Sequence, residues 1–78
     1  MTVSKNRVSI YYGTTLDRVV PMTPGEVEST LHQIGRVYEE STSWQQGETW
    51  YHDFKDWQGE LAVRVVVEPA EAVGTVNP

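Results

Sequence analysis

The stretch from Thr23 to Glu40, TPGEVESTLHQIGRVYEE, carries the clearest structural signal in the chain. Thr23 can cap the free N–H groups of a helix start, Pro24 suits the first helical position, and Glu26 completes a capping box. Apolar residues then recur at helical spacing, at Val27, Leu31, Ile34 and Tyr38. The pattern predicts one amphipathic helix from about Pro24 to Glu40, which Gly35 weakens by about 1 kcal/mol relative to alanine.

Two strands are predicted before this helix. Residues 7–12, RVSIYY, alternate between two faces and are rich in β-branched and aromatic side chains, which is typical of a strand. Residues 16–22, LDRVVPM, predict a weaker strand. Pro21 should end it, because proline has no N–H to donate to a neighbouring strand.

Two more strands are predicted after the helix. Residues 41–47 read as a polar connection, and alternation returns in residues 48–54. Residues 55–59, KDWQG, have the composition of a hairpin loop. Residues 60–68, ELAVRVVVE, alternate again and end at Pro69.

The predicted order is therefore β-β-α-β-β, an α+β fold with an antiparallel four-stranded sheet and one helix packed on one face. Residues 1–69 are expected to form a single small domain, and residues 70–78 a flexible tail. The predicted core consists of Val8, Ile10, Tyr12, Val20, Val27, Leu31, Ile34, Tyr38, Trp50, Phe54, Leu61, Val63, Val65 and Val67.

Composition argues against several classes of function. The chain has 78 residues, no cysteine and a net charge of −5, so disulfides, thiolate metal sites and cysteine nucleophiles are excluded. A mostly acidic chain lacks the clustered Lys and Arg side chains that phosphate binding requires, so no direct nucleic-acid binding is expected. No apolar run approaches the length of a membrane span. The expected location is the cytoplasm, without membrane association.

The chain offers weak candidates for catalysis or metal binding. The only local cluster of ligand-type side chains surrounds His52 and Asp53, and neighbours on a strand point to opposite faces, so they cannot easily share one ion. His52 is interpreted as a partly buried, hydrogen-bonded residue. No serine lies in a nucleophile elbow and no glycine-rich phosphate loop is present. We therefore expect no enzymatic activity, no cofactor and no bound metal.

One helix is too small to cover both faces of the predicted sheet. Alternation places Tyr11, Tyr51, Ala62 and Val66 on the uncovered face, with Ser9, Thr49, Asp53 and Arg64 between them. Aromatic side chains flanked by polar groups are the common composition of protein-binding surfaces. Trp57 is expected at the tip of the hairpin loop.

These observations favour a small acidic protein-interaction domain that binds a protein partner and inhibits or bridges it. The predicted contact residues are Tyr11, Tyr51, Trp57, Arg64 and Val66. Glu48, Asp53 and Asp56 are expected to steer the domain towards a partner with a basic surface. A phage or mobile-element protein that blocks a host enzyme is one hypothesis of this class.

Other functions stay open from the sequence alone. The tryptophans and Tyr51 could stack on the sugar rings of a glycan or on a cation. The chain could be a structural component of a homo-oligomeric assembly, or a homodimer joined by a sheet edge or by the uncovered face. A metal-dependent enzyme that uses His52 is the least favoured alternative.

Overall fold

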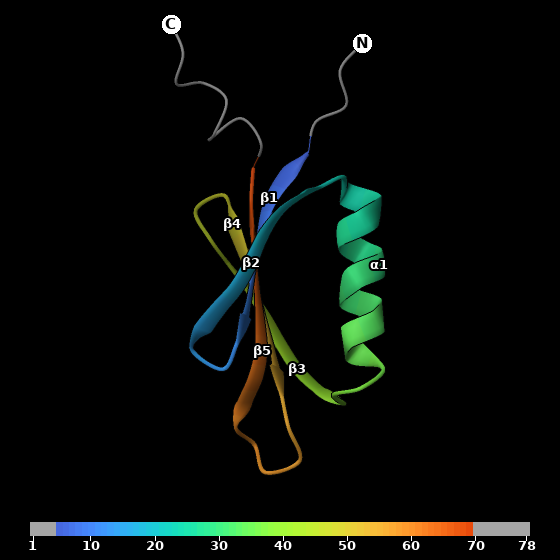
Figure 1. The fold of residues 1–78 in the computed structure, drawn as a ribbon, viewed down its shortest axis with the longest axis vertical. Coiled ribbons are helices and arrows are strands. Elements are labelled where there is room, and N and C mark those ends of the chain that lie inside the picture. Colours follow the sequence, from blue (N-terminus) through green and yellow to red (C-terminus); the bar gives the residue numbers. More distant parts are fainter. Residues whose placement is uncertain (1–4, 70–78) are drawn as a thin grey trace, which may run out of the picture.

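A computed structural model describes residues 5–69 and shows an α+β fold with one helix on one face of an antiparallel sheet (Figure 1). The elements in chain order are β1 (Asn6–Tyr12), β2 (Thr15–Met22), α1 (Pro24–Gly35), β3 (Glu40–Gln46), β4 (Thr49–Lys55) and β5 (Leu61–Glu68). The sheet has five strands in the order β2-β1-β5-β4-β3. The fold class is confirmed, and the predicted number of four strands is wrong by one.

The capping box at the start of α1 is present as predicted. The Thr23 hydroxyl accepts from the backbone N–H of Glu26, and the Glu26 carboxylate accepts from the backbone N–H of Thr23. The helix ends at Gly35, five residues earlier than predicted. Gly35 has low helix propensity, and Glu39 and Glu40 would place negative charge at a helix C-terminus, where it is unfavourable.

The additional strand is β3, which the sequence had suggested to be a polar connection. It pairs with β4 in a regular antiparallel register from Glu40 opposite Lys55 to Gln46 opposite Thr49. All seven of its residues are exposed, so it has no apolar stripe to reveal the period of a strand. The turn that joins it to β4 contains Gly47 at a φ of 65°.

The core lies between α1 and the central strands. Its buried apolar side chains are Val8, Ile10, Val27, Phe54, Val63, Val65 and Val67, and Met22, Leu31, Ile34, Tyr38 and Ala62 pack against them. Four predicted core residues are wrong. Val20 and Leu61 are partly buried but do not pack against this core, and Tyr12 is 54% exposed and Trp50 43% exposed. Tyr12 ends β1, and Trp50 lies opposite Gln45 on the edge strand β3, so both are at the margin of the area that α1 covers.

Within residues 5–69 no helix is long and apolar enough to cross a membrane. The predicted tail, residues 70–78, lies outside the described part of the chain.

The loop predicted at residues 55–59 is confirmed as the turn between β4 and β5, with Gly59 at a φ of 82°. Asp56 organises this turn, because its carboxylate accepts from the backbone N–H groups of Gln58 and Glu60.

Replacing Gly47 by alanine should destabilise the domain by about 1 kcal/mol, because a side chain in the left-handed region is strained. Gly25 is the matched control. A Cβ atom added at either glycine would meet no other atom within 4 Å, and only Gly47 has a positive φ. Gly25→Ala in α1 should leave the free energy of unfolding unchanged or slightly raised. Urea denaturation of both variants measures the difference, and equal stability would contradict the assigned turn.

Candidate functional site

The candidate site is the sheet face opposite α1, which we call the open face. The register places Ser9 opposite Val19 and Val66, and Tyr11 opposite Leu16 and Arg64. On the other half of the sheet, Tyr51 lies opposite Trp44 and Val66, and Asp53 opposite Thr42 and Arg64. The open face therefore carries Ser9, Tyr11, Leu16, Val19, Thr42, Trp44, Tyr51, Asp53, Arg64 and Val66. The predicted placement of Tyr11, Tyr51, Asp53, Arg64 and Val66 on one face is confirmed.

An aromatic stack marks the β3–β4 side of the open face. The rings of Trp44 and Tyr51 are 5.2 Å apart between centroids and only 5° from parallel. The Arg64 guanidinium carbon lies 5.7 Å from the centre of the Trp44 ring, within the range of a cation–π contact. These contacts hold Trp44 in one orientation, although its strand is at the sheet edge and the side chain is 36% exposed.

A bidentate ion pair with Asp53 holds Arg64 in this position. Its Nε donates to one Asp53 carboxylate oxygen at 2.6 Å and its Nη2 donates to the other at 2.8 Å. Asp53 is only 8% exposed, so the guanidinium compensates for a carboxylate largely withdrawn from water. The same hydrogen bonds raise the pKa of Arg64.

Apolar side chains extend the open face across the whole sheet. Leu16 and Val19 are exposed on the opposite edge strand, β2. Between the two edges runs a groove of about 440 Å³, which includes Tyr11, Tyr51, Arg64 and Val66 in its lining. The face thus combines exposed apolar groups at both edges with an ordered polar centre.

The structure separates the predicted contact residues into three places. Tyr11, Tyr51, Arg64 and Val66 share the open face, whereas Trp57 is 91% exposed in the β4–β5 turn. Glu48 lies in the turn before β4, and Asp56 directly follows that strand. The two acids are therefore roughly 25 Å apart along the strand direction. The Asp53 carboxylate binds Arg64 and that of Asp56 binds its own turn, so Glu48 is the steering acid that remains exposed.

Sequence reasoning did not find Trp44, Leu16 and Val19 as members of this face. Trp44 is the single apolar residue among the polar ones of β3, so no alternation revealed its direction. The register of β1 and β2 shifts between Ile10 and Tyr11. This bulge reverses which residues of β2 point towards the open face. Alternation within one strand cannot show such a reversal.

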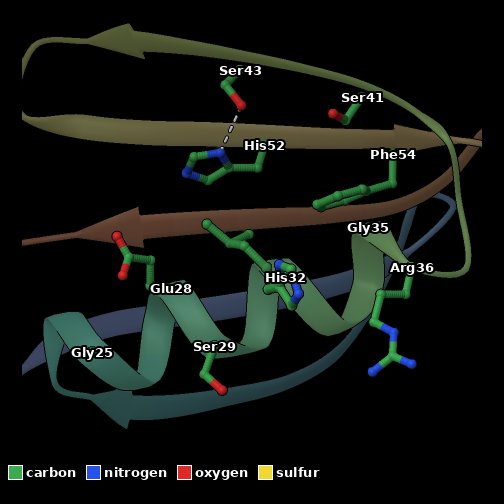
Figure 2. Close-up of a pocket in the computed structure, with 11 residues that line it drawn as sticks. Gly25, Glu28, Ser29, His32, Gly35, Arg36, Ser41, Ser43, His52 and Phe54 are labelled. Carbon is green, nitrogen blue, oxygen red and sulfur yellow. Dashed lines mark hydrogen bonds between the residues drawn. The ribbon is translucent and has the colours of Figure 1, made fainter.

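A second groove lies on the other side of the sheet, between α1 and the strands β3 and β4 (Figure 2). It has a volume of about 840 Å³. Leu31 and His32 come from the helix, and Ser43, His52 and Phe54 come from the strands. The groove exists because α1 packs over the core and leaves this part of the sheet uncovered.

His52 lies in the lining of this second groove as its polar centre. It is partly buried and hydrogen-bonded, as the sequence predicted. A hydrogen bond of 2.8 Å joins its Nδ1 to the Ser43 hydroxyl. Burial lowers the pKa of His52, and the neighbouring Asp53 carboxylate opposes this effect. A hydroxyl bonded to imidazole supplies two of the three members of a catalytic triad, but no described residue forms a hydrogen bond to the other ring nitrogen.

The chain matches no family model, and no curated protein or solved structure is significantly similar to it. Residues 5–69 contain no group of three or more His, Cys, Asp or Glu side chains placed to hold a metal ion. His52 and Asp53 lie on opposite faces of β4, as alternation predicted. The surfaces from which a function can be inferred are the two grooves, the exposed edges and a hollow of about 530 Å³ beside the β4–β5 turn, which Val37 and Trp57 help to line.

Removing Arg64 should lower the free energy of unfolding by about 1–3 kcal/mol, because it leaves the buried Asp53 carboxylate unpaired. Arg64→Met keeps much of the side-chain length. Its matched control is Arg18→Met, which breaks an exposed Arg–Asp pair and should change stability little. A double-mutant cycle with Asp53→Leu should show that the double variant is more stable than Arg64→Met alone. Additive losses would contradict the coupling of these two residues.

The domain should lose stability as the pH falls through the ordinary pKa of histidine, about 6.5. Because the folded state lowers the pKa of His52, the unfolded chain binds the proton more readily and protonation favours unfolding. His52→Gln should flatten the dependence of the unfolding midpoint on pH between about 7 and 5. The same substitution at exposed His32 is the control. An unchanged slope in the His52 variant would contradict this origin.

Proposed function

We propose that the chain is a small protein-interaction domain that uses the open face to bind a protein partner and so inhibits or bridges it. The observation that carries the proposal is the ordered Trp44–Tyr51–Arg64–Asp53 cluster on a face that no other described element covers. Trp, Tyr and Arg are the residue types that contribute most to protein–protein binding energy.

The dimensions of the open face suit a protein better than a small ligand. Its apolar side chains occur on all five strands, from Leu16 and Val19 on β2 to Trp44 on β3. At the usual spacing between strands this distance is roughly 19 Å. With strands of seven or eight residues, the face covers roughly 450 Å², about half of what each partner contributes to a standard protein interface, and it is open and not an enclosing pocket of the kind that small ligands occupy.

The side chains at the centre of the open face are already ordered in the free protein. Stacking and the ion pair already fix Trp44, Tyr51 and Arg64, so association loses little side-chain entropy there. Leu16 and Val19 supply apolar area beside this centre. A partner that places an apolar side chain against this centre would remove from water both the apolar pair Leu16 and Val19 and the Trp44–Tyr51 stack.

Charge favours a partner with a basic surface. The net charge is −5, whereas Arg64 and Asp53 neutralise each other within the open face. The excess negative charge therefore acts at long range and speeds the approach of a basic protein. Of the three predicted steering acids, Glu48 is the one whose carboxylate makes no described contact, and it is exposed in the turn before β4.

The three tryptophans provide an experiment that assigns the binding surface. Trp44 belongs to the open face, Trp50 lies on the helix side of the sheet, and Trp57 lies at the tip of the β4–β5 turn. Each is replaced by alanine in separate immobilised baits, which are incubated with a lysate of the cells that naturally make the protein. Captured proteins other than the chain itself are quantified by mass spectrometry.

Trp44→Ala and Tyr51→Ala should reduce specific capture at least tenfold, which is the loss typical of a binding hot spot. Trp50→Ala is the matched control because it removes the same side chain from a site of similar exposure on the other face, and it should retain capture. Trp57→Ala shows whether the turn contributes. Equal capture by the folded Trp44 variant, or a loss restricted to Trp50→Ala, would overturn the proposal.

A further inference from the structure

We propose that β3 pairs with β3 of a second copy of the chain, antiparallel and about a two-fold axis at Ser43, so that the two sheets become one. This contact is made by the backbone edge of β3, which also carries the open-face residues Thr42 and Trp44. Its test measures self-association, whereas the test of the function proposed above measures capture of another protein. The two edges of the sheet differ in how well they are protected against pairing with another strand.

The edge formed by β2 has the features that natural proteins use to prevent pairing. Pro21 lies within it and cannot donate a backbone hydrogen bond. Asp17 and Arg18 form an exposed charged pair on this strand. A bulge interrupts its register with β1 between Ile10 and Tyr11. Another strand would meet charge, irregular backbone and a missing donor along this edge.

The edge formed by β3 has none of these protections. Its sequence, ESTSWQQ, contains no proline and no basic residue, and its single charge is Glu40 at one end. Its register with β4 is regular over all seven residues. No strand within residues 5–69 pairs with its outer side. An extended, regular and nearly uncharged edge of this kind is a template for an added strand.

The sequence of β3 is compatible with pairing to itself in the antiparallel direction. With the axis at Ser43, all seven residues pair, and Glu40 of each copy lies opposite Gln46 of the other. The two Glu40 carboxylates are then roughly 20 Å apart, so no like charges meet. Trp44 lies opposite the small Thr42 of the second copy, and Ser41 lies opposite Gln45. A second copy can therefore pair along the whole length of β3 without like charges meeting at the contact.

Such pairing has a consequence for the open face. A two-fold axis that relates antiparallel edge strands is perpendicular to the sheet, so both copies keep their helices on the same side. The open faces then form one continuous surface, with the two Trp44–Tyr51 stacks next to the axis. Pairing of one strand buries less area than a standard interface, so the dimer should dissociate on dilution.

Paired charges at Ser41 and Gln45 test this arrangement. Both side chains are exposed on β3, and each lies opposite the other across the proposed axis. In the double variant S41K/Q45K every lysine faces a lysine, whereas in S41K/Q45E every lysine faces a glutamate. Sedimentation velocity over a range of concentrations gives the dissociation constants, and circular dichroism verifies that both variants are folded.

The wild-type chain should be a concentration-dependent dimer. S41K/Q45K should raise the dissociation constant by about tenfold or more, and S41K/Q45E should lower it. General repulsion cannot explain this order, because S41K/Q45K brings the net charge of −5 closer to zero. Val19→Lys, on the open face of β2, should leave the dimer unchanged.

Three outcomes would overturn the inference. One is a wild-type chain that stays monomeric at the highest concentration that remains soluble. The second is equal dimerisation of S41K/Q45K and S41K/Q45E. The third is a dimer that Val19→Lys disrupts while S41K/Q45K does not, since that result assigns association to the open face. None of them changes the tryptophan experiment, in which capture of another protein is measured.

Discussion

The constraint on which the rest of this structure depends is the size of its helix. α1 has twelve residues, a length of about 18 Å, and it lies against a sheet of five strands. It can exclude water from the centre of one face only. The buried core is consequently small, with seven apolar side chains in the described residues. The open face, the groove beside β4 and the outer edge of β3 all result from this incomplete coverage.

The open face is stabilised by contacts within its own layer. Ser9 and Asp53 are buried there, although no helix or second sheet in residues 5–69 covers them. Arg64 satisfies the Asp53 carboxylate and also approaches the ring of Trp44. The residues that protect this side of the sheet from water are therefore the residues proposed to bind a partner. Changes at Arg64 affect folding and binding together, whereas Trp44 at the edge can be changed with a smaller effect on the fold.

The sequence predicted those features that depend on local patterns. The capping box at Thr23 and Glu26 placed the start of the helix, and alternation placed Val8, Ile10, Val63, Val65 and Val67 in the core. It missed β3, because a strand exposed on both faces has no apolar period. It also placed Tyr12 and Trp50 inside, because alternation gives the face of a side chain but not the extent of the covering helix. The Trp44–Tyr51 stack depends on pairing between β3 and β4, and was not predictable once β3 had been read as a connection.

The two proposed contacts have one physical origin. A domain of this size buries a modest fraction of its surface and is close to the limit for folding alone. The chain has no cysteine, so disulfides cannot add stability. Association that involves only the folded state does add stability, in proportion to the logarithm of the partner concentration. A strand added to β3 extends the hydrogen-bonded layer, and a protein on the open face covers its second side. Under both proposals, association would supply the burial that a second helix supplies in a larger domain, and it would act at β3 and the open face, the surfaces that lack the protections found on β2.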